Sequence, residues 1–128
     1  MPTLDQIETI RRLNDAARRY PGHASRAVVT EGFQALPDAD RFAALAVIVG
    51  FTKFDGDNDP YGEHDFGAVY RLPQGTWTER RPDDAETITQ TVFWKIDSYD
   101  NALMFGSEAP WDEAQTKRVL TIMLASEY

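Results

Sequence analysis

The stretch that decides the fold is Thr87-Ile88-Thr89-Gln90-Thr91-Val92-Phe93-Trp94-Lys95-Ile96-Asp97. It is rich in β-branched and aromatic residues, which favour strands, and its side chains alternate between two faces. Val92, Trp94 and Ile96 share one face, so Trp94 is expected in the core rather than on a ligand-stacking surface. The stretch therefore predicts a β-strand with one face buried.

Shorter runs predict the other strands. A period of two also extends from His64 to Leu72, and one face there carries Phe66, Ala68, Tyr70 and Leu72. Beyond the turn at Pro73-Gln74-Gly75, Trp77 begins another strand. Residues 102–105 are expected to return as an antiparallel partner after a turn at Tyr99-Asp100-Asn101, and residues 27–30 form a short β-branched strand.

Three segments have helical patterns. Thr3 and Gln6 have the spacing of a capping box ahead of a helix from about Leu4 to Tyr20. On this helix Asp15 is placed to pair with Arg18 or Arg19 on a solvated face. Asp38 is expected to cap a second helix, whose apolar stripe is Phe42, Leu45, Ala46 and Val49. A capping-box-like start at Asp112 precedes a wide apolar arc over residues 119–124, which predicts a C-terminal helix buried against the sheet.

The order of these elements predicts an α+β fold. We expect a single globular domain over residues 1–128, with a mostly antiparallel sheet of roughly three to five strands and about three helices. The chain is long enough to bury its own core, and its 42% content of hydrophobic residues argues against disorder.

Composition also limits the function. The chain has no cysteine, which excludes disulfides, thiolate catalysis and cysteine-based zinc sites. It shows no secretory signal and no apolar run near the ~20 residues that cross a bilayer, so we expect a cytoplasmic protein without membrane association. Neither a phosphate-binding glycine loop nor a serine-hydrolase elbow is present.

The charge is acidic and unevenly distributed. The formal net charge is −8; residues 1–30 hold five arginines against three acidic residues, and the remainder holds 8 basic and 18 acidic residues, a net of −10. An acidic body repels a phosphate backbone, so direct nucleic-acid binding is not expected. Such a body attracts basic surfaces, and acidity is equally common among proteins as a source of solubility.

The most acidic segment precedes the strand at His64. Asp55, Asp57 and Asp59 alternate like the first ligands of an EF-hand, but Pro60 stands where glycine is needed and Phe66 where a bidentate glutamate is needed. The EF-hand is therefore excluded. No cofactor is expected, unless a divalent cation is held by a different set of carboxylates: Asp57, Asp59, Glu63 and Asp65.

The same segment has a purely structural interpretation. Asp59-Pro60-Tyr61-Gly62 places aspartate, proline and glycine at the positions that a type I turn prefers. The turn would steer the chain from the second helix into the strand, and this interpretation is favoured over metal binding.

A second constellation follows from strand pairing. If the strand that begins at His64 pairs antiparallel with the strand that ends at Asp97, Asp65 shares a face with Lys95 and Asp97. His64, Asp65, Lys95 and Asp97 would then gather at one end of the sheet. They could support general acid–base chemistry or a metal-activated water, and they could equally form a salt-bridged network without catalytic function.

Three blocks of the sequence carry a resemblance to a known family: Asn58-Asp59-Pro60-Tyr61-Gly62-Glu63-His64-Asp65-Phe66-Gly67, Val92-Phe93-Trp94-Lys95-Ile96-Asp97-Ser98-Tyr99-Asp100, and Thr116-Lys117-Arg118-Val119-Leu120-Thr121-Ile122-Met123-Leu124-Ala125-Ser126-Glu127-Tyr128. Together they resemble a family of small bacterial proteins of unknown function that plasmids and other mobile elements often encode. The resemblance implies that genetic setting, and it implies no catalytic residue.

Two function classes follow. The first is a small acidic, non-enzymatic binding protein, an inhibitor or modulator of a host defence-type protein, which meets a basic protein surface. Its binding residues would be Asp55, Asp57, Asp59, Glu63, Tyr99 and Asp100. The second is a small metal-dependent or acid–base enzyme that uses His64, Asp65, Lys95 and Asp97. The sequence carries no indication of an oligomeric state.

Overall fold

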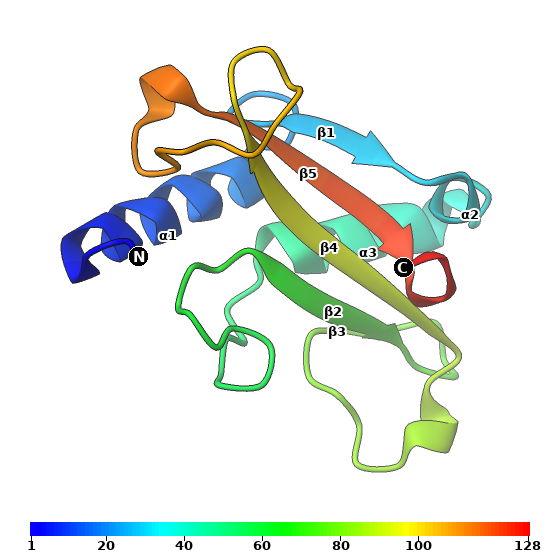
Figure 1. The fold of residues 1–128 in the computed structure, drawn as a ribbon. Coiled ribbons are helices and arrows are strands. Elements are labelled where there is room, and N and C mark those ends of the chain that lie inside the picture. Colours follow the sequence, from blue (N-terminus) through cyan, green and yellow to red (C-terminus); the bar gives the residue numbers. More distant parts are fainter.

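The sheet has five strands, and its order along the sheet is β1-β5-β4-β2-β3 (Figure 1). The computed structural model describes residues 1–128. The strands are β1 Arg26–Val29, β2 Phe66–Arg71, β3 Trp77–Thr78, β4 Gln90–Tyr99 and β5 Lys117–Leu124. Only the β1–β5 pair is parallel. The predicted mostly antiparallel α+β fold is therefore confirmed.

Three α-helices accompany the sheet: α1 Leu4–Arg19, α2 Glu31–Gln34 and α3 Asp38–Val49. Single turns of 3₁₀-helix lie at Ala85–Thr87, Glu113–Gln115 and Ala125–Glu127. Thr3 and Gln6 form the predicted capping box of α1. The start of α3 is also confirmed, but Pro37 is its N-cap and Asp38 is its first helical residue, so the predicted capping role of Asp38 is wrong.

Both long helices cover the same face of the sheet, and Figure 1 shows α1 and α3 on its far side. The core lies between these layers. Trp94 and its neighbours Val92 and Ile96 are buried there, as the alternation of β4 predicts. Ala44 and Ile48 are the fully buried residues of α3, whereas Phe42 is 70% exposed. The predicted stripe of this helix is therefore wrong for Phe42 and for Ala46, which is also exposed.

The C-terminal segment is a strand, and the predicted C-terminal helix is wrong. β5 lies between β1 and β4, where both of its edges are paired. A short continuous apolar run is compatible with a buried helix or a buried strand, and its period alone does not separate them. The capping signal at Asp112 is real, but it serves only the single 3₁₀ turn at Glu113–Gln115.

Two other strand predictions need correction. Residues 102–105 form bends rather than a strand, and a single bridge joins Tyr99 to Gly106. In β2 the buried residues are Gly67 and Val69, so the helix-covered face is opposite to the face that carries Phe66 and Tyr70. The reason is steric: a Cβ on Gly67 would lie 2.6 Å from Trp94 Nε1, so the missing side chain makes room for the indole.

No α-helix here has the length and apolar character that a membrane span requires.

Candidate functional site

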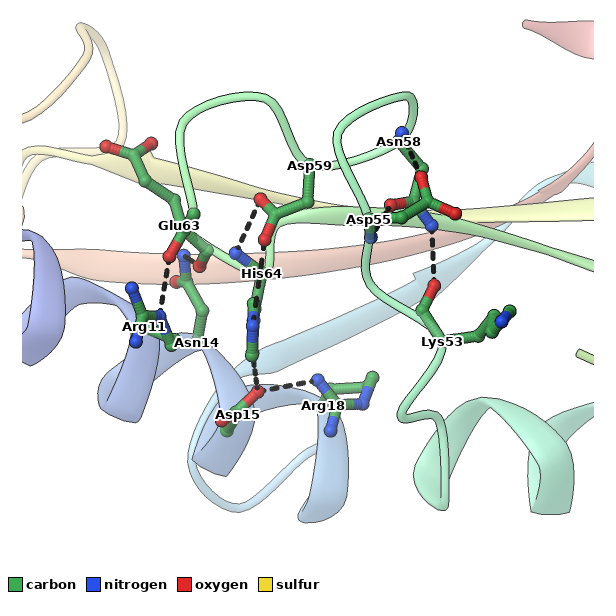
Figure 2. Close-up of polar contacts among 11 residues, drawn as sticks. Arg11, Asn14, Asp15, Arg18, Lys53, Asp55, Asn58, Asp59, Glu63 and His64 are labelled. Carbon is green, nitrogen blue, oxygen red and sulfur yellow. Dashed lines mark hydrogen bonds and ion pairs between the residues drawn. The ribbon is translucent and has the colours of Figure 1, made fainter.

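The candidate site is the acidic loop, defined as residues 55–65, between α3 and β2. Its first half is closed by its own polar side chains (Figure 2). Asp55 accepts backbone N–H bonds from Asp57 and Asn58, and Asn58 bonds back to Asp55 N and Lys53 O. The predicted turn follows, because Gly62 N donates to Asp59 O at 3.2 Å. Local sequence therefore shapes this loop.

α1 holds the second half of the loop. Arg11 Nε donates to Gly62 O at 2.7 Å, and Asn14 Nδ2 donates to Glu63 O at 2.9 Å. The helix is thus bonded to loop carbonyls some fifty positions later in the chain. Arg18, which the sequence places on a solvated helix face, is 1% exposed, and Asn14 is 2% exposed. No local signal identifies these contacts, because they depend on long-range packing.

His64 lies between two carboxylates, one from each side (Figure 2). Its Nδ1 is 2.9 Å from Asp15 Oδ1, and its Nε2 is 3.6 Å from Asp59 Oδ2. The imidazole also stacks on Phe54, with the ring centroids 3.7 Å apart. Both ring nitrogens therefore face protein groups, an arrangement that fixes the loop and leaves neither nitrogen directed at a substrate.

Arg18 completes this network. It donates to Asp15 Oδ1 at 2.9 Å, and its guanidinium lies 5.4 Å from the ring centroids of Phe54 and Trp94. Burial alone would raise the pKa of Asp15, but the bonds from His64 and Arg18 outweigh it and lower the pKa. The predicted Asp15–Arg18 pair is confirmed, and it lies in the interior instead of in solvent.

The predicted convergence of His64, Asp65, Lys95 and Asp97 is wrong in its register. Phe66 is opposite Lys95, and Asp65 O accepts a bond from Ile96 N, one residue further along β4. Positive φ at His64 breaks the period of two just before the strand and turns the imidazole toward α1. A catalytic role for this set stays a prediction.

Lys95 and Asp97 pair only with each other. Their ion pair spans 2.9 Å, and both side chains are more than a third exposed. The hydrogen bond to Asp97 raises the pKa of Lys95. The geometry is that of a surface ion pair.

The predicted metal ligands do not assemble. No three histidine, aspartate or glutamate side chains are arranged to hold a metal ion. Within the proposed set of Asp57, Asp59, Glu63 and Asp65, Asp59 Oδ1 already accepts the His64 backbone N–H at 3.1 Å, and Asp57 is exposed near the start of the loop.

Tyr99 and Asp100, also predicted as binding residues, lie at the end of β4. Asp100 Oδ1 accepts the Met104 backbone N–H at 3.0 Å, which shapes the following bend. Leu103 has φ +59°, and Leu103, Met104 and Phe105 are all exposed. The predicted turn at residues 99–101 lies instead at residues 100–103, where Leu103 N donates to Asp100 O at 2.9 Å, and the Asp100 carboxylate is bonded within it.

Glu63 and Asp65 stand out electrostatically. Both carboxyls are partly buried, and neither forms an ion pair. Burial raises the pKa of Glu63, and the charges of Asp65 and Asp59 raise it further. Burial likewise raises the pKa of Asp65, with added repulsion from Asp59 and Asp97. Arg118 acts in the opposite direction on Glu63, and His64 does so on Asp65, but both pKa values remain raised.

Aromatic residues adjoin this charge. On the helix-free face, Phe66 and Phe93 have ring centroids 5.2 Å apart, and Phe93 and Tyr128 have centroids 5.6 Å apart. We call these three residues the aromatic cluster. In the acidic loop Tyr61 is 73% exposed. The loop and the cluster meet at Asp65 and Phe66.

Comparison with known proteins adds a family. A family model described as "Protein of unknown function (DUF3768)" matches residues 29–127. No curated protein and no solved structure matches significantly. The matched residues include the acidic loop and β2 to β5, whereas α1 and all of β1 except Val29 lie outside them.

Proposed function

This chain belongs to the family described as "Protein of unknown function (DUF3768)", and we propose that it is a non-catalytic binding protein whose acidic loop docks on a basic surface of another protein. The observation that carries the proposal is the pair Glu63 and Asp65, which are partly buried and form no ion pair. The family description names no activity, so the support for this proposal is the partial burial of these two carboxyls.

Unbalanced carboxylates destabilise the free protein. When folding raises the pKa of a carboxyl, the folded state becomes less stable as the pH rises through that pKa. At neutral pH both Glu63 and Asp65 therefore lower the free energy of unfolding. A lysine or arginine from a partner would relieve this repulsion on binding. Groups that lower the stability of the folded state are typical of functional surfaces, because an arrangement of side chains that serves function is often not the most stable one.

The acidic loop is also pre-organised. Arg11 and Asn14 hold its backbone carbonyls, and His64 is bonded to α1. A rigid loop loses little conformational entropy when a partner binds, so more of the interaction energy appears as affinity. In Figure 2 the Glu63 carboxylate points away from α1 and from the bonds that hold the loop.

Aromatic residues supply apolar area for the same surface. Tyrosine is among the residues that most often dominate binding energy, and Tyr61 is largely exposed on the held loop. The aromatic cluster extends the surface onto the helix-free face of the sheet. The net charge of −10 over residues 31–128 would speed association with a basic partner. As a finer proposal, the partner is a host defence-type protein that this chain inhibits or modulates.

The test is partner capture with matched variants. We would compare the wild type, Glu63→Gln/Asp65→Asn and the control Asp83→Asn/Glu86→Gln, which makes the same charge change at exposed residues in another loop. The proposal predicts a partner that the wild type and the control retain and the first variant loses, with binding that weakens as salt rises. Equal retention by both double variants, or no partner at any salt concentration, would contradict it.

A further inference from the structure

A second feature lies away from the acidic loop: a pocket of about 520 Å³ between the end of α1, the turn that follows it and the start of β5. We call it the basic pocket. Its wall includes the cations Arg26, Lys117 and Arg118 and one carboxylate, from Glu113. This excess of positive charge contrasts with the acidic character of the chain as a whole.

Arg118 is the unusual member of the wall. The residue is 7% exposed, yet it forms no ion pair with any carboxylate. Its Nε donates to Asn14 Oδ1 at 2.7 Å, and one terminal nitrogen donates to Pro110 O. Burial lowers the pKa of Arg118, as expected for a guanidinium away from water, and the more distant Glu113 and Glu63 act in the opposite direction.

These contacts orient the guanidinium without neutralising it. The two bonds fix its plane, and they leave its second terminal nitrogen without a hydrogen bond to the protein. A buried charge is costly unless an opposite charge compensates it. Arginine with a fixed plane is well suited to bind a carboxylate or phosphate oxygen.

The rest of the wall fits an organic anion. Arg26 and Lys117 are exposed at the first residues of β1 and β5, where they can attract and contact an anionic group. Leu13 and Leu103 give the wall apolar side chains. The volume lies in the range of small-molecule sites, and apolar walls with a few fixed polar groups are their usual composition.

We propose that the basic pocket binds a small organic anion, whose carboxylate or phosphate group contacts Arg118, Arg26 and Lys117 and whose apolar part lies against Leu13 and Leu103. The proposal does not rest on the docking function of the acidic loop, although Asn14 bonds both to Glu63 O and to Arg118 Nε. The chemistry common to the ligands is an anionic oxygen group on a compact apolar body.

The experiment uses benzoate and phenyl phosphate as probes, with benzylammonium as a probe of the same shape and opposite charge. Each is titrated at constant ionic strength by calorimetry and by NMR of the Arg118 Nε–H resonance. We expect saturable binding of at least one anion, a shift of that resonance, and no binding of benzylammonium. A preference between the two anions identifies carboxylates or phosphate esters as the ligand class.

Matched variants make the test specific. Arg26→Gln/Lys117→Gln removes two exposed cations of the pocket, and it is expected to raise the Kd for the anion by about tenfold or more. The control Lys53→Gln/Arg80→Gln makes the same charge change at exposed residues elsewhere and should leave Kd unchanged. The proposal is overturned if neither anion binds saturably, if the Arg118 resonance does not move, or if both double variants bind the anions equally.

Discussion

Replacing His64 by asparagine separates a structural histidine from a catalytic one. Asparagine tolerates the positive φ of this position, so the change tests the ring and not the backbone. The ring makes a charge-assisted hydrogen bond to Asp15, worth about 1.5–3 kcal/mol, and a stacked contact with Phe54, worth about 0.5–1.5 kcal/mol. Because the side chain is 21% exposed and asparagine keeps some polar bonding, we expect a net loss of about 2–3 kcal/mol.

The loss is measured by urea unfolding at neutral pH, with thermal unfolding as a second probe. For a domain of this size it corresponds to a decrease in Tm of roughly 6–15 °C. The control is His23→Asn, because His23 is exposed and a surface change is expected to stay within about 0.5 kcal/mol. A loss below about 1 kcal/mol for His64→Asn would refute the structural role, since replacing a catalytic residue is often neutral or stabilising.

Three further substitutions test the packing and hydrogen bonds of the elements next to the acidic loop. Gly67→Ala places a Cβ against Trp94 and is expected to cost about 1–3 kcal/mol by urea unfolding, because the indole must shift. Thr3→Ala removes half of the capping box of α1 and should cost about 1 kcal/mol in the same assay. Asp15→Asn tests pH dependence: the pKa of Asp15 is lowered by folding, so its contribution is present at neutral pH and is lost as the pH falls. The difference in unfolding free energy between wild type and Asp15→Asn should therefore shrink from about pH 4 downward.

The fold could be predicted in large part, and the errors have physical causes. The capping box, the turn before β2 and the alternation of β4 are local signals, and the structure retains all three. The sequence does not distinguish β5 from a helix, because the period of its short apolar run fits either element. Gly67 lies on the buried face of β2, where its missing side chain leaves room for Trp94, 27 positions later in the chain.

The sequence predicts where the candidate site lies along the chain, but not which residues of other elements contact it. The sequence identifies the acidic loop as distinctive, and it places the turn correctly. It does not show that Asp15, Asn14 and Arg18 of α1 hold that loop, because such partners are set by tertiary packing. A period of two predicts Asp65 on one face with Lys95 and Asp97, and it does not reveal the register of β2 against β4 or the positive φ at His64.

The central claim is that Glu63 and Asp65 serve recognition at the expense of folding. The most direct measurement is the Tm of Glu63→Gln/Asp65→Asn at neutral pH, alongside capture of the partner by the same variant. Relief of the repulsion is expected to add about 1 kcal/mol or less after solvent screening, and the gain should vanish below about pH 3, where both carboxyls are protonated in the folded and the unfolded state. We predict a higher Tm together with loss of the partner, and an unchanged result for Asp83→Asn/Glu86→Gln. A lower Tm, or a retained partner, would contradict the claim.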